Sequence, residues 1–130
     1  MNNYSQTLLR FSALFAVIGA VLGAHMAGAG SFAFRPIHAH ILVVGWLSLF
    51  AWAVYYKVFY KQESTLAKLH VWTAIIGSIG LTVGMWFQFL QPFNLPSTFN
   101  LIFYIAGGTV LLISYICFFI LTLIHKPTND

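Results

Sequence analysis

Four long runs of apolar residues alternate with three short breaks along the chain. Each run holds about twenty residues or more, which is enough for an α-helix to cross a hydrocarbon core of roughly 30 Å. The expected spans are Leu8 to Ala29, Pro36 to Tyr60, Leu69 to Leu90 and Phe99 to Ile124. Because the breaks are short, successive helices should run antiparallel. The pattern predicts an all-α fold, in which four transmembrane helices form a single membrane domain over residues 1–130.

Proline and charge mark the breaks between these runs. Pro36 suits the first turn of the second helix, where its missing N–H would have no partner in any case. Residues 61–65 form the only charged break. Pro92 and Pro96 lie in the third break and should end one helix and begin the next.

Basic residues are distributed unevenly over the two ends of the predicted bundle. One end carries five of them, and the other carries only Arg35; the five are Arg10, Lys57, Lys61, Lys68 and Lys126. The positive-inside rule then places both termini in the cytoplasm. His25, His38 and His40 should lie near the outer face, whereas His70 and His125 should lie near the inner one. The expected location is the bacterial inner (plasma) membrane, which the chain would cross several times.

The composition supports lipid as the solvent. Hydrophobic residues make up 60% of the 130 residues and charged residues only 6%, whereas a soluble domain is roughly a quarter charged. The net charge of +4 is therefore interpreted as a determinant of topology, and no nucleic-acid partner is expected. Tyr55 and Tyr56, close to Lys57, fit an aromatic belt at the inner interface.

The positions of the histidines predict different roles for them. A titratable side chain inside a membrane span is costly and usually marks a functional site. His125 and His70 lie at helix ends beside lysines, and we expect interfacial or packing roles for both. His25 lies among small residues, where hydrogen bonding between helices and metal ligation both stay open.

His38 and His40 have a spacing that suits two separate ligands. Two residues along a helix correspond to about 200° of rotation, so the imidazoles should point to nearly opposite faces. A single ion prefers a spacing of three or four, whereas each haem iron takes an imidazole along its axis. Gly45, on the face of His38, would let a macrocycle lie flat. Arg35 could pair with haem propionates, and Trp46 could line the cofactor cavity.

These residues resemble a known family. The segment RPIHAHILVVGW (residues 35–46), continuing to Tyr55 and Tyr56, resembles the tenth helix of the catalytic subunit of haem-copper oxidases. The likeness is closest to C-type cytochrome oxidases and nitric oxide reductases. The segment KLHVWTAIIG (residues 68–77) resembles the eleventh helix. The likeness covers roughly residues 35 to 86, while the outer two helices match only in hydropathy.

The resemblance implies a role for each histidine of the pair. His38 would be the axial ligand of the high-spin haem, and His40 an axial ligand of the low-spin haem. The family's copper ligands and second low-spin ligand lie on helices that have no match in this chain. In the family, twelve helices form three arcs of four, so a homotrimer of this chain could imitate the whole. A b-type haem would then lie between neighbours, with His38 from one copy and His40 from the next.

Three functions follow as hypotheses. The first is haem binding for electron transfer with a redox partner, or for binding O₂ or NO; whether the chain is an enzyme stays open, because oxidase or reductase chemistry needs a second metal. The second is a copper or zinc site near the outer face, formed by His25, His38 and His40. The third is a non-catalytic subunit of a respiratory complex, whose histidines only form hydrogen bonds between helices.

Overall fold

The computed structural model describes residues 3–125, and this part of the chain is helical without strands. Four helical rods are each long and apolar enough to cross a membrane: α1 (Tyr4–Ala29), a second rod spanning Arg35–Val58, α4 (Thr65–Leu90) and α5 (Ser97–Ile124). The second rod consists of α2 (Arg35–His40), the π-helix η1 (Ile41–Ser48) and α3 (Leu49–Val58). The prediction of an all-α chain with four membrane-length helices is confirmed.

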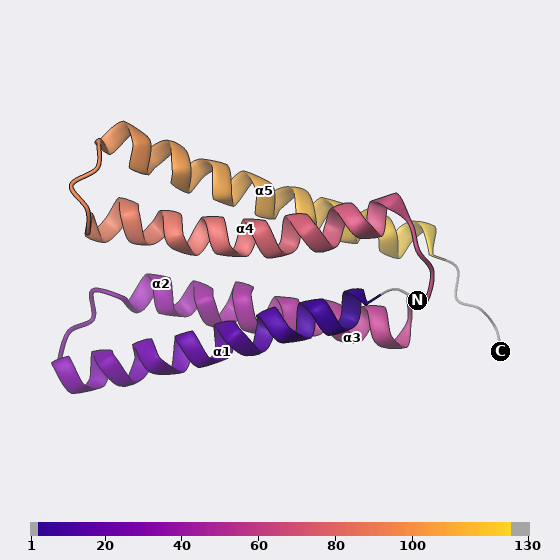
Figure 1. The fold of residues 1–130 in the computed structure, drawn as a ribbon, viewed down its shortest axis with the longest axis horizontal. Coiled ribbons are helices and arrows are strands. Elements are labelled where there is room, and N and C mark those ends of the chain that lie inside the picture. The colour runs from indigo at the N-terminus through magenta and orange to yellow at the C-terminus, as the bar shows by residue number, and fades with distance from the viewer. Residues whose placement is uncertain (1–2, 126–130) are drawn as a thin grey trace.

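The rods pair in chain order as two antiparallel hairpins (Figure 1). One hairpin joins α1 to the α2–η1–α3 rod, and the other joins α4 to α5. Breaks 30–34 and 91–96 lie at one end of the bundle, which we call the histidine end. Break 59–64 lies at the other, which we call the lysine end. The hairpins lie closer together at the lysine end than at the histidine end.

Local signals set the helix boundaries. Ser64 is extended, with φ −148° and ψ 153°, and its side chain accepts a hydrogen bond of 3.0 Å from the backbone N–H of Ala67, so α4 begins at Thr65 rather than near Leu69. Gly30 follows α1 with φ 61°, a left-handed conformation that glycine adopts without strain. Pro36 occupies the first turn of α2, as predicted.

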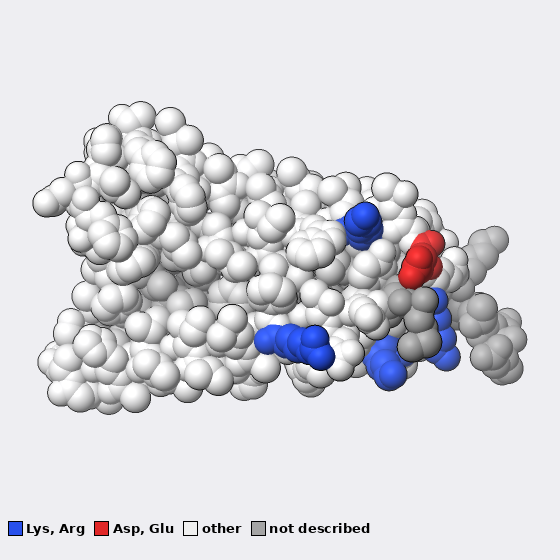
Figure 2. All heavy atoms as spheres, viewed as in Figure 1, with Lys and Arg blue, Asp and Glu red and all other residues white. Residues whose placement is uncertain are grey.

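Charge is segregated along the bundle. Figure 2 shows lysine and arginine atoms only over the half of its visible face that lies toward the lysine end. Lys57 is in the last turn of α3 at the lysine end, whereas Arg35 begins α2 at the histidine end. The predicted separation of these charges is thus present, while Lys126 lies outside the described residues.

Glycines allow close contact between the backbones of α4 and α5. A Cβ at Gly77 would lie 2.5 Å from the backbone nitrogen of Leu111, and one at Gly84 would lie 2.6 Å from the Cα of Tyr104. Between these two points, Gly107 lies directly against the backbone of Gly80. Small residues at such positions let membrane helices approach until their backbones touch. The α4–α5 hairpin is therefore a tightly packed unit.

The π-helix η1 was not predicted. Such wide helical segments are rare and often occur at functional sites. The Ser48 Oγ donates to the carbonyl of Val43, five residues earlier, at 2.9 Å, and the Ser12 Oγ of α1 donates to the carbonyl of Trp46 at 3.1 Å. The Tyr115 hydroxyl of α5 lies 2.9 Å from the Ser48 Oγ. Side chains from both hairpins thus stabilise the segment that follows His38 and His40.

Candidate functional site

His40 is exposed on the surface of the second rod, within an apolar membrane-length segment. Its Nδ1 lies 2.8 Å from the carbonyl oxygen of Pro36. Because a carbonyl oxygen can only accept, Nδ1 must carry the proton, and the neutral ring then has its lone pair on Nε2. Histidines that bind metals are commonly oriented by such a hydrogen bond from the other ring nitrogen. His40 therefore presents Nε2, with its lone pair, on the outer surface of the chain, where it could bind a metal ion.

His38 lies on a different face of α2. Its ring packs against α1, where a Cβ at Gly23 would lie 3.1 Å from the His38 Cε1. Its Nδ1 is buried and has no hydrogen-bond partner among the described residues. The two imidazoles thus occupy different faces of the helix, as the spacing predicted, but only that of His40 is exposed.

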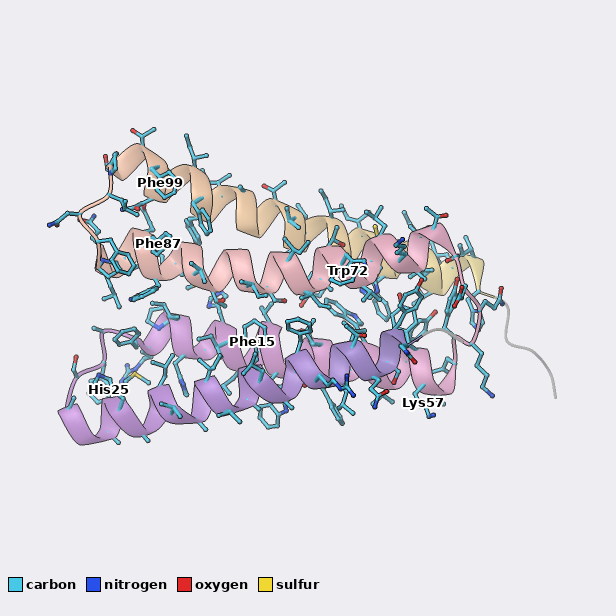
Figure 3. The ribbon with its side chains drawn as sticks, viewed as in Figure 1. Phe15, His25, Lys57, Trp72, Phe87 and Phe99 are labelled. Carbon is cyan, nitrogen blue, oxygen red and sulfur yellow. The ribbon has the colours of Figure 1, made fainter. Side chains whose placement is uncertain are left out.

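Gly45 lies on the same α1-facing side of the rod as His38. The space that its missing side chain leaves is occupied. The Phe15 ring of α1 occupies the position that a Gly45 side chain would take. Figure 3 shows Phe15 on α1 among the side chains of the first hairpin. A macrocycle therefore does not fit against Gly45 within a single chain. The glycine instead lets α1 approach the π-helix.

Arg35 and Trp46 lie on the surface of the second rod. Arg35 is exposed, and its guanidinium carbon lies 4.4 Å from the centre of the Phe32 ring. Trp46 is 40% exposed, and its carbonyl accepts the bond from Ser12. Both side chains remain accessible to a ligand outside the chain.

His25 does not complete a metal site with His38 and His40. It is exposed near the end of α1, with its ring edge-on to that of Phe34 at a centroid distance of 6.0 Å, and Figure 3 shows it at the opposite end of the bundle from Lys57. Within residues 3–125, no three histidine, cysteine, aspartate or glutamate side chains form a group that could hold a metal ion. The hypothesis of a copper or zinc site built by one chain has no support in this geometry.

His70 is completely buried at the lysine end. Its Nδ1 is 2.7 Å from the Tyr56 hydroxyl, and the Trp52 ring meets it edge-on at 4.8 Å. The burial of His70 agrees with the packing role that was one of the two expectations for it, and Tyr56 is likewise only 3% exposed, so both side chains face the protein interior. The spacing of Trp52, Tyr56 and Tyr60 by four residues could have indicated a buried stripe.

A groove of about 530 Å³ separates the hairpins along α1, α2, η1 and α4. Its walls are almost entirely apolar, with Phe15, Ile37 and Trp86 among them, and Thr82 is its one hydroxyl-bearing residue. No histidine, cysteine or methionine lines the groove, so it supplies no axial ligand to iron.

Searches of protein-family models, curated proteins and solved structures found no match to this chain. The resemblance of residues 35–86 to haem-copper oxidases therefore stays a prediction.

Proposed function

We propose that the chain is an integral membrane protein that binds b-type haem through His40 and acts in electron transfer or in binding a diatomic gas. The observation that carries this proposal is the exposed His40 imidazole, with Nδ1 bound to the Pro36 carbonyl and Nε2 left for a ligand. Polar rings inside a membrane span usually serve a function. The lysine end would face the cytoplasm of a bacterium, following the positive-inside rule.

Haem suits this site better than a bare metal ion does. Structural zinc takes four protein ligands and catalytic zinc three, and no group of three ligands forms within the described chain. A porphyrin brings four nitrogens of its own and asks the protein only for axial ligands. The chain has a single cysteine, Cys117, so it lacks the C-x-x-C-H sequence that attaches haem covalently.

Other residues at the histidine end would complete the haem site. Arg35 is exposed one turn before His38 and could form charge-assisted hydrogen bonds with propionates. Trp46 is exposed on the same rod and could contact the macrocycle. His38 is the weaker ligand candidate, because its ring would have to leave Gly23 before it could reach iron.

Assembly as a homotrimer would supply the rest of the pocket. His40 faces outward, so a haem bound there needs a second wall, and a neighbouring copy in a closed ring can provide it. Bound haem supplies one-electron redox chemistry when both axial positions are filled, and an open site for O₂ or NO when one is free. A redox partner would then be expected in the first case.

The absorption spectrum of the purified, haem-loaded protein tests this proposal. We expect a Soret band in the wild type and its loss in His40→Ala, while His25→Ala, a matched control at the same end, keeps it. Adding CO to the reduced protein distinguishes an open axial position, which shifts the band, from a filled one. A protein that stays colourless, or equal haem content in the two variants, contradicts the proposal. Sedimentation in mild detergent should give three chains per particle.

A further inference from the structure

A second cavity, of about 730 Å³, lies at the lysine end between the start of α1 and the end of α3. Ser5, Gln6 and Leu9 line it from α1. Tyr56 and Lys57 line it from α3, and Lys61 lines it from the break that follows. It lies at the opposite end of the bundle from His40 and has no part in the proposed haem site.

The charge of this cavity favours an anion. Lys57 and Lys61 contribute two positive charges, and Glu63 contributes one negative charge, so the lining carries a net charge of +1. Ser5 and Gln6 also line the cavity, and their hydroxyl and amide groups can donate hydrogen bonds. Phosphate oxygens accept bonds from both kinds of donor, and charge assistance makes the bonds to lysine the stronger ones.

The position of the cavity favours a lipid as the source of that phosphate. The cavity is formed where two membrane-length helices end, which is the level of the headgroups in a bilayer. Leu9, which is 44% exposed, adds an apolar wall on the side of the membrane core. We propose that this cavity binds the phosphate headgroup of an anionic phospholipid, with Lys57 and Lys61 as its cationic contacts.

Competition between two lipids with identical acyl chains tests this site. The full-length protein is mixed with equal amounts of phosphatidylglycerol and phosphatidylcholine, and the lipids that remain bound are counted by native mass spectrometry. We expect a preference for phosphatidylglycerol. The preference should fall about 5-fold in Lys57→Gln or Lys61→Gln and about 30-fold in the double variant. The reason is that each lysine near an anionic lipid surface contributes about 1 kcal/mol of binding free energy, which corresponds to about 5-fold in affinity.

Two exposed cations that do not line the cavity serve as matched controls. Lys68→Gln and Arg10→Gln should keep the preference within about 2-fold of the wild type. Lys57→Arg, within the cavity, retains the positive charge and should not lower the preference. Circular dichroism checks that every variant remains helical. An equal loss in Lys68→Gln would overturn the proposal, because it would indicate nonspecific attraction. Displacement of the lipid by millimolar inorganic phosphate at constant ionic strength would also overturn it.

Discussion

The neighbouring residues Tyr55 and Tyr56, at the lysine end, differ in the hydrogen bonding of their hydroxyl groups. The Tyr56 hydroxyl forms a hydrogen bond with His70, and it also lies 3.4 Å from the carbonyl of Ala67. The Tyr55 hydroxyl is buried without any partner among residues 3–125. A buried polar group that loses its partner costs free energy, whereas removing an unpartnered one does not.

We therefore expect opposite results from Tyr56→Phe and Tyr55→Phe. The first leaves the His70 Nδ1 without its partner and should lower the free energy of unfolding by about 1–3 kcal/mol. The second removes a hydroxyl that makes no bond and should leave stability unchanged or slightly raised. Denaturation in SDS followed by circular dichroism measures both. A larger loss in Tyr55→Phe would contradict the assignment of the bond to Tyr56.

Residues 38 and 40 show how far sequence reasoning reaches at this scale. Their spacing predicted that the imidazoles occupy different faces, and they do. The spacing did not indicate that α1 covers His38, nor that Phe15 fills the space beside Gly45, because both facts depend on the register between two helices. Register is set by the packing of complementary surfaces, which a pattern along one helix does not contain.

Among the elements, the seam between α4 and α5 depends on glycine more than on large side chains. A Cβ at Gly107 would overlap three backbone atoms of Gly80 and Leu81, so a larger residue has to force the helices apart. Gly28 of α1, by contrast, has nothing within 4 Å of the position of a Cβ.

Gly107→Ala should therefore destabilise the protein by roughly 1–3 kcal/mol, the usual cost of overpacking. Gly28→Ala is the matched control and should be neutral or slightly stabilising, because alanine is the better helix former. The free energy of unfolding in mixed micelles measures the difference. Equal free energies of unfolding for the two variants would show that the seam accommodates a side chain at position 107 without loss of stability.

The four apolar runs predicted the helices because length and hydropathy suffice to define a membrane span. The ends were less well predicted, since Ser64 extends α4 by four residues before the apolar run starts at Leu69. The sequence did not predict the π-helix. Besides the bond from Ser48 to Val43 within η1, it receives bonds from Ser12 and Tyr115, which lie on other helices and which no local pattern indicates.

At the scale of the whole molecule, few hydrogen bonds join the two hairpins within residues 3–125. The bond between Ser48 of η1 and Tyr115 of α5 is one of them, and it reaches the π-helix directly. Because the Ser48 Oγ already donates to Val43, the Tyr115 hydroxyl is the donor in this pair. The aromatic cluster around Trp52 packs beside it, with Tyr115 at a centroid distance of 4.9 Å.

A double-mutant cycle with Ser48→Ala and Tyr115→Phe should give a coupling free energy of about 0.6 kcal/mol, typical of hydrogen bonds between membrane helices. Thr109→Ala is the control, because that hydroxyl bonds only to the carbonyl of Ile105 in its own helix. Combining it with Ser48→Ala should give a coupling near zero. A coupling near zero for the first pair would show that the hairpins are not joined through this bond.

Pairing in chain order also has a consequence for biosynthesis. Gly19 and Gly23 of α1 lie against residues 38–42, and Phe15 lies against Gly45, so this seam forms within the first half of the chain. The first hairpin, α1 with the α2–η1–α3 rod, can therefore pack in the bilayer before α4 and α5 have left the ribosome. The α4–α5 hairpin can then form and pack against it. Translation itself would thus set the sequence of assembly steps.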